Sequence, residues 1–117
     1  MKLKNILIVV DDIDRAVEFY KEIFGLYVVL NSDSNVILSE GLVLQDKKVW
    51  QETLGKEIES HNNAMELYFE DSDIGKLLGK IENIEETIEF VSKGDEMLRF
   101  YDPFGNLIEV RKKQHGV

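Results

Sequence analysis

The chain contains no cysteine, so disulfide bonds, thiolate metal sites and a cysteine nucleophile are all excluded. It also has a single proline and no long polar tract, and its 44% hydrophobic and 32% charged residues are typical of a folded protein. No apolar run approaches the length of a membrane-spanning helix, and the opening segment MKLKNILIVVDD becomes acidic too early for a signal peptide. These absences predict one compact domain in the cytoplasm.

Positive charge is also scarce. The 117 residues include 14 lysines and arginines against 23 aspartates and glutamates, which gives a net charge of -9. A negative field repels phosphate backbones and anionic lipids, so neither nucleic acid nor a membrane surface is an expected partner. Cationic ligands and metal ions would be attracted, but acidity of this degree is also common in soluble proteins that bind neither.

The first half of the chain predicts the order strand, helix, three strands. The apolar run ILIVV at residues 6–10 is rich in β-branched residues, which favours a buried strand. Apolar residues then recur with helical spacing over 13–24, between the capping candidates Asp11 and Asp12 and the terminating Gly25. Three short strands are predicted at 26–30, 35–39 and 42–46.

The second half repeats this order. A strand is predicted at 65–69, and after a cap within 71–73 the helical spacing returns over 74–81. Three further strands are predicted at 87–92, 96–101 and 106–110. VVDDID aligns with FEDSDI and GLVLQD aligns with GNLIEV, which indicates an internal duplication.

Two modules are therefore predicted within residues 1–117, at about 1–46 and 64–112, joined by a connector at about 47–63. The connector is the only long irregular stretch in the pattern, and it contains Trp50. Two interpretations are open. It is either an inter-module linker that buries the tryptophan, or a segment that packs back as a short helix or a flap over a pocket.

The two ends of the repeat resemble a known family. The chain opens with a hydrophobic strand, DD and a helix ending in FYKEIFGL, and it closes with YDPFGNLIEV. With the duplicated βαβββ unit, these motifs resemble the vicinal oxygen chelate superfamily of glyoxalase I, extradiol dioxygenases, fosfomycin-modifying enzymes and bleomycin-resistance proteins. The resemblance implies an α+β fold whose two βαβββ modules form a curled, mainly antiparallel eight-stranded open barrel. It also implies a homodimer.

The resemblance further implies a metal position at the ends of four strands. The corresponding residues in this chain are Asn5, Gln45, Glu66 and Glu109. Two carboxylates and two amide oxygens would suit a hard divalent cation such as Mg²⁺ or Mn²⁺ better than Zn²⁺. Metal-using members usually have histidine at the opening strands, whereas His61 and His115 lie elsewhere and are interpreted as surface residues. Two alternatives follow from the sequence: a divalent cation bound at this position, or a site without a metal.

Strand alternation after Gly105 places Glu109 on the same face as Leu107 and Arg111. Without a metal, Glu66 and Glu109 in one pocket are expected to raise each other's pKa, so that one carboxyl could act as an acid or a base. A cationic ligand would relieve the same repulsion. The remaining alternative is that one of these glutamates simply reaches bulk water at the mouth of the barrel.

Three functions follow as hypotheses. The first is a metal-independent binder of a small organic molecule or drug, similar to bleomycin-resistance proteins. Its expected polar anchors and aromatic walls are Glu66, Glu109, Trp50 and Tyr68. The second is a divalent-metal-dependent lyase, isomerase or dioxygenase similar to glyoxalase I, in which the metal stabilises an enolate and Glu109 or Glu66 moves the proton. The third is a non-catalytic interaction module.

Basic residues near the C-terminus complete the candidates. Arg99 and Tyr101 share a strand face and are expected to line the pocket, unless Arg99 pairs with a carboxylate at the surface. The run from Arg111 to Lys113 is interpreted as a solvated basic end.

Overall fold

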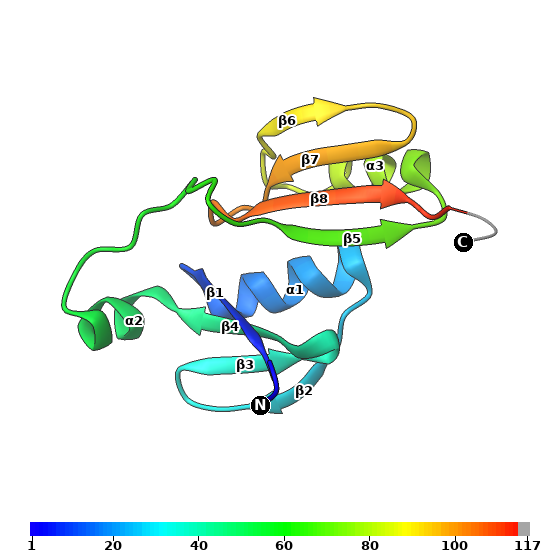
Figure 1. Ribbon diagram of the computed structural model, residues 1–117. Helices are drawn as coiled ribbons and strands as arrows, with labels where there is room; N and C mark the ends of the chain where they lie inside the picture. The colour runs from blue at the N-terminus through cyan, green and yellow to red at the C-terminus, as the bar shows by residue number, and fades with distance from the viewer. Residues whose placement is uncertain (115–117) are drawn as a thin grey trace. The chain divides into compact units, whose positions relative to one another are not determined.

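The computed structural model describes residues 1–114, and its contacts divide the chain into two compact units. Unit 1 is Met1–Glu59, and unit 2 begins at Ser60. Each unit contains a strand, a helix and three further strands in that order, and each has its own four-stranded sheet (Figure 1). The prediction of an α+β fold built from two βαβββ modules is confirmed. Across residues 1–114 the eight strands form two mainly antiparallel sheets.

Unit 1 follows the predicted order closely. Its elements are β1 (Ile6–Val10), α1 (Ile13–Phe24), β2 (Val28–Asn31), β3 (Asn35–Leu38), the 3-10 turn η1 (Ser39–Gly41), β4 (Leu42–Asp46) and α2 (Lys47–Leu54). The strand order is β1-β4-β3-β2, with β1 and β4 parallel and the other neighbours antiparallel. Helix α1 contacts β4.

Helix α1 has the ends that its sequence predicts. The Asp12 side chain accepts a hydrogen bond from the backbone nitrogen of Arg15 at 3.1 Å, and Gly25 ends the helix in the left-handed conformation, with φ 69°. The apolar side of the helix is buried through Ala16, Phe19, Tyr20 and Ile23. These residues form the core of unit 1 with the α1-facing side chains of the sheet.

The connector contains a helix rather than only irregular chain. Helix α2 occupies its first half and contacts β1 and β4, and Trp50 within it is half-buried. Of the two interpretations of this segment, the structure therefore shows a short helix that packs back onto unit 1.

Unit 2 repeats the topology of unit 1. Its elements are β5 (Leu67–Asp71), α3 (Ile74–Glu82), β6 (Phe90–Lys93), β7 (Met97–Tyr101) and β8 (Leu107–Lys112). The strand order is β5-β8-β7-β6, with β5 and β8 parallel. Helix α3 contacts β7 and β8. Ile108 and Val110 are buried on one side of β8, which confirms the predicted alternation and leaves Glu109 on the opposite side.

The turn between β7 and β8 is fixed by side-chain hydrogen bonds and by a glycine. The buried side chain of Asp102 accepts hydrogen bonds from the backbone nitrogens of Phe104 at 2.9 Å and Asn106 at 2.8 Å. Gly105 has φ 90°, and a Cβ atom there would lie 2.7 Å from the Cβ of Ser60. Glycine is therefore required both by backbone conformation and by the close approach of the chain at residue 60.

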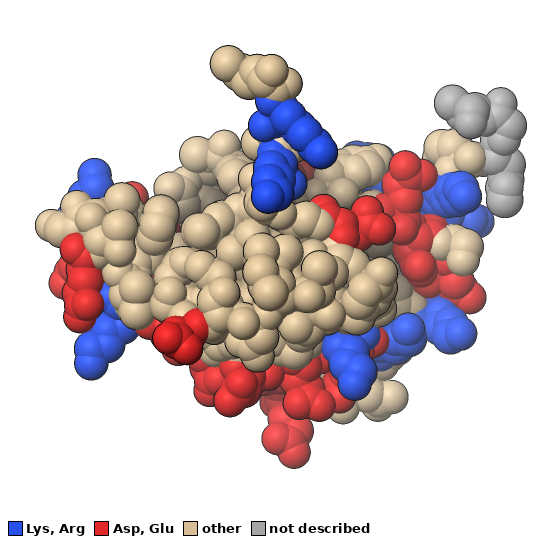
Figure 2. Space-filling view, turned by 90° about the horizontal axis from the view of Figure 1, so that it is seen from below, with Lys and Arg blue, Asp and Glu red and all other residues tan. Residues whose placement is uncertain are grey.

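Charge on the outside reflects the acidic composition. Figure 2 shows one face of the molecule, on which acidic side chains border an uncharged area. No helix within residues 1–114 is long and apolar enough to span a membrane.

Candidate functional site

The candidate site lies on the sheet face of unit 2 that is opposite to Ile108 and Val110. Glu109 of β8 is paired in register with Tyr68 of β5 on one side and with Arg99 of β7 on the other. Side chains of residues paired in this way point to the same face of a sheet. Tyrosine, glutamate and arginine thus form one row across three strands.

Two flanking pairs extend this face. Tyr101 of β7 pairs with Leu107 of β8, and Met97 pairs with Arg111. Glu66 lies just before β5 begins. The pairing places Arg111 diagonally across from Arg99, so both guanidinium groups lie beside the carboxylate of Glu109.

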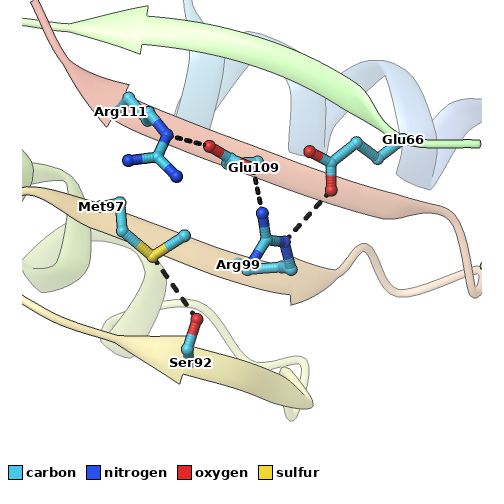
Figure 3. Close-up of polar contacts among 6 residues, drawn as sticks. All are labelled: Glu66, Ser92, Met97, Arg99, Glu109 and Arg111. Atoms are coloured by element: carbon cyan, nitrogen blue, oxygen red, sulfur yellow. Dashed lines mark hydrogen bonds and ion pairs between the residues drawn. The ribbon is translucent and has the colours of Figure 1, made fainter.

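Arg99 joins the two carboxylates that the sequence singled out. Its Nε donates a hydrogen bond to Oε2 of Glu66 at 3.2 Å, and its Nη2 donates to Oε1 of Glu109 (Figure 3). Nε of Arg111 donates to Oε2 of the same Glu109 carboxylate. These four residues, Glu66, Arg99, Glu109 and Arg111, are called the carboxylate–guanidinium network below. Arg99 pairs with carboxylates, one of the two roles predicted for it, but it binds two of them.

The network is buried at its centre and exposed at its edges. Glu109 is only 3% exposed, whereas the side chains of Glu66, Arg99 and Arg111 are 26%, 31% and 49% exposed. An ionised carboxylate in such a position is costly unless it is paired and hydrogen-bonded. The alternative that the site glutamate simply reaches bulk water is therefore wrong for Glu109.

The pKa of Glu109 lies below its usual range. Burial alone raises the pKa of this carboxyl, but hydrogen bonding to Glu66, the hydrogen bond from Arg111, and the charge and hydrogen bond of Arg99 together lower the pKa by more than burial raises it. The pKa of Arg99 is raised, chiefly by its hydrogen bond to Glu66. The expectation that the two carboxylates raise each other's pKa is wrong for Glu109, because hydrogen bonding to Glu66 and the two guanidinium groups lower the pKa of Glu109. Glu109 is therefore ionised at neutral pH and holds no proton to donate.

Arg111 is a site residue that the sequence analysis misjudged. It was interpreted as part of a solvated basic end, whereas its guanidinium bonds the buried carboxylate two residues earlier in β8. The alternation that places Arg111 and Glu109 on one face was the signal that could have identified this contact.

The equivalent face of unit 1 is uncharged. Gln45 is 3% exposed, its Nε2 donates to the carbonyl oxygen of Ser34 at 3.1 Å, and its Oε1 accepts from Nδ2 of Asn35 at 3.4 Å. Nδ2 of Asn5 donates to the carbonyl oxygen of Gly41 at 3.2 Å. Both amides are therefore used to hold strand ends of unit 1 together.

The two predicted metal ligands of unit 2, Glu66 and Glu109, do not fit a divalent cation between them as their side chains are bonded. Both oxygens of Glu109, Oε2 of Glu66 and Oε1 of Gln45 already accept hydrogen bonds from protein groups. In the described part of the chain, residues 1–114, no three or more His, Cys, Asp or Glu side chains are placed to hold a metal ion. A guanidinium lies between the two carboxylates, where a metal would have to bind them both.

The predicted aromatic walls lie in different elements. Tyr68 is 58% exposed beside Glu109, and Tyr101 is half-buried on β7. The His61 ring lies 4.6 Å from the Tyr101 ring, so this histidine is a neighbour of a candidate ligand residue rather than only a surface group. Trp50 belongs to α2 of unit 1. His115 lies outside the described residues.

A separate groove of about 510 Å³ lies in unit 1 between α1 and the β2–β3 hairpin. Its lining includes Val17, Glu18 and Asp33. None of the predicted site residues lines it, so the carboxylate–guanidinium network remains the candidate site.

Comparison with known proteins agrees with the fold and the motifs. The glyoxalase-like domain family matches residues 3–114. Because this match covers nearly the whole chain, the protein belongs to the glyoxalase-like domain family. It is thus a member of the vicinal oxygen chelate superfamily, and the resemblance inferred from the motifs is confirmed.

Several solved structures share the fold. A glyoxalase-related enzyme from Fulvimarina pelagi is 18% identical with a TM-score of 0.76, over 96% of this chain and 88% of that chain. The trypanothione-dependent glyoxalase I of Leishmania major is 22% identical with a TM-score of 0.68, over 96% and 86%. A fosfomycin resistance protein of Listeria monocytogenes is 14% identical with a TM-score of 0.71, over 97% and 92%.

No curated protein sequence matches this chain significantly. At the identities of the solved structures the likeness shows the fold alone, and one fold of this kind hosts many chemistries. The chemistry of this chain has to be argued from its own residues.

Proposed function

We propose that this chain is a metal-independent binder of a small organic molecule, and that the carboxylate–guanidinium network with its flanking tyrosines is the binding surface. The observation that carries the proposal is the bonding of Arg99 to both Glu66 and Glu109. The network carries two negative and two positive charges, so its carboxylates are compensated without a metal ion.

The ligand chemistry follows from the hydrogen-bond donors that are left. A guanidinium has five N–H donors. Within residues 1–114, Arg111 spends only Nε on Glu109, and Arg99 spends Nε and one N–H of Nη2. The remaining N–H groups favour acceptor oxygens, such as carbonyl or carboxylate oxygens. Tyr68 and Tyr101 on the same face favour a planar or apolar group beside those oxygens.

A cationic drug anchored directly by the two glutamates is less favoured than the sequence suggested. Both carboxylates already have cationic partners, and a ligand cation would have to displace one of them. A metal-dependent lyase, isomerase or dioxygenase would require the same displacement, by a metal ion.

The test is a thermal-shift screen of small organic molecules on chelator-treated protein, followed by calorimetric titration of each hit. A ligand that binds only the native state raises its stability. Tyr68→Ala is expected to weaken the affinity of a hit by about tenfold, since a well-packed aromatic contact contributes on the order of 1.5 kcal/mol. Tyr27→Ala is the matched control, because Tyr27 is similarly exposed but belongs to unit 1. Hits whose affinity is unchanged by Tyr68→Ala would reject this face as the binding surface.

A further inference from the structure

Two carboxylates of unit 2 converge on one internal cation. Arg99 bonds Glu66 through Nε and Glu109 through Nη2, as Figure 3 shows. A divalent cation bound by both carboxylates would need these same oxygens. The positive charge of the guanidinium, which is hydrogen-bonded to them, would repel it. The Arg99 guanidinium and a divalent cation therefore compete for one position.

The second guanidinium does not have this bridging role. Arg111 bonds only Oε2 of Glu109, and no contact joins it to Glu66 within the described chain. Loss of Arg111 would leave the bridge between the carboxylates intact. Loss of Arg99 would leave Glu66 without its cation and would free Oε1 of Glu109.

The charges around the position support binding of a cation once Arg99 is gone. With a neutral residue at position 99, the two network carboxylates are opposed by Arg111 alone. Glu70, the register partner of Arg111 on β5, adds another exposed carboxylate to the same face. Hard divalent cations bind carboxylate oxygens and can complete their coordination with water.

We infer that Arg99 is the residue that excludes divalent metal from this face, and that a neutral residue at position 99 would uncover a site for a hard divalent cation such as Mn²⁺. The inference rests on the proposed metal-independent function and adds the residue that determines it. The guanidinium is a resident cation, supplied by the chain itself, between Glu66 and Glu109.

The experiment is a Mn²⁺ titration of the chelator-treated full chain. Binding is measured by calorimetry and by the loss of the electron paramagnetic resonance signal of free Mn²⁺. Arg99→Gln is expected to bind one Mn²⁺ at least about tenfold more tightly than the wild type. Arg111→Gln is the matched control and is expected to stay within about threefold of the wild type, because the bridge remains. The double variant Arg99→Gln/Glu109→Gln is expected to lose the gain.

Folding of Arg99→Gln is checked in parallel by circular dichroism and thermal unfolding, because the substitution removes a partner of a buried carboxylate. If the variant folds only when Mn²⁺ is present, and not in sodium chloride of equal ionic strength, the metal has replaced the guanidinium and the inference is supported.

If Arg99→Gln stays unfolded in both solutions, the Mn²⁺ affinity of Arg99→Lys is measured instead and decides whether the inference holds. A lysine ammonium is a point charge without the planar fork that bonds both carboxylates. A Mn²⁺ affinity above that of the wild type then supports the inference, and an equal affinity overturns it.

A folded Arg99→Gln variant with wild-type Mn²⁺ affinity also overturns the inference. The titration contains no organic ligand, so its result is separate from that of the binding screen. If Tyr68→Ala weakens the binding of organic ligands while Arg99→Gln shows no gain in Mn²⁺ affinity, the role of Arg99 is overturned and the proposed function is left standing. If Arg99→Gln gains Mn²⁺ affinity but Tyr68→Ala leaves the affinity of the organic hits unchanged, the role of Arg99 is supported and the proposed binding surface is rejected.

Discussion

The two units of this protein place different chemistry at the same point of the same sheet topology. In unit 1, Gln45 of β4 lies between Val9 of β1 and Asn35 of β3, and all three side chains are uncharged. In unit 2, Glu109 is equivalent to Gln45, and its register partners are Tyr68 of β5 and Arg99 of β7.

The βαβββ scaffold therefore accepts either arrangement, and different interactions stabilise each one. The amide of Gln45 is satisfied by a backbone carbonyl and a neighbouring amide, so its burial needs no charge. The carboxylate of Glu109 is equally buried and needs Arg99 and Arg111 to compensate its charge. Within residues 1–114, the buried polar residue of the closing strand therefore needs ion pairs in unit 2 and not in unit 1.

Loss of the bridging guanidinium of Arg99 is expected to lower the stability of the protein most. Arg99→Met is expected to lower the free energy of unfolding by about 3 kcal/mol, because it leaves buried Glu109 short of a partner. Asn35→Leu, at the equivalent position of unit 1, is expected to cost less, about 1–2 kcal/mol, since it leaves only the neutral Oε1 of Gln45 without its long hydrogen bond. Urea unfolding of both variants measures the two costs. Equal costs would show that the charged row is no more important to stability than the neutral row.

A second comparison concerns the glycines that precede the closing strands. A Cβ atom at Gly105 would lie 2.7 Å from the Cβ of Ser60, whereas one at Gly41 would meet its nearest neighbour, the carbonyl oxygen of Lys4, at 3.2 Å. Both glycines have positive φ, so alanine is strained at each, by about 1–2 kcal/mol. The contact at Gly41 is tight, but the overlap at Gly105 is more severe and adds more to the strain. Gly105→Ala is expected to lower the thermal midpoint more than Gly41→Ala, and the reverse order would contradict the assigned close approach.

A smaller effect is expected in the pH dependence of stability. The folded-state pKa of Glu109 is lowered, so its contribution to stability is fully present above the ordinary glutamate pKa and is lost as the pH falls through the folded-state value. The stability difference between the wild type and Glu109→Gln should therefore shrink below about pH 4. Gln45→Leu in unit 1 is the control, because no titrating group is removed and its cost should change little over that range. Denaturant unfolding at several pH values gives both curves, and a Glu109→Gln difference that is constant down to pH 2 would contradict the lowered pKa.

The smallest effect is expected for the outer guanidinium. Arg111→Gln should lower the free energy of unfolding by about 1 kcal/mol, because the Arg111 side chain is half exposed and Arg99 still compensates Glu109. Lys112→Gln, at the neighbouring exposed position, is expected to change stability by less than about 0.5 kcal/mol. If the two substitutions cost the same, the bond between Arg111 and Glu109 contributes nothing to stability.

Much of the fold could be predicted from local patterns. Helix α1 begins and ends where the apolar spacing, the Asp12 cap and Gly25 predict, because these signals act within one or two turns of the chain. Strand β5 was predicted at 65–69 but lies at Leu67–Asp71. Its ends are decided by pairing with β8, and Leu67 opposite Ile108 is the first residue of that pairing. A long-range register of this kind leaves no local signal in the strand itself.

Local sequence patterns are enough to predict the duplicated modules, the strand alternation that puts Glu109 on the face opposite to Ile108 and Val110, and the acidic character of the chain. These follow from periodicity, from turn residues and from composition. Tertiary structure alone decided that Arg99 bonds both Glu66, 33 residues away, and Glu109, 10 residues away. It also decided that Arg111 belongs to the site and that the pKa of Glu109 falls. The pKa of a buried carboxylate depends on which charges surround it in space, and folding of the sheet is what brings those charges together.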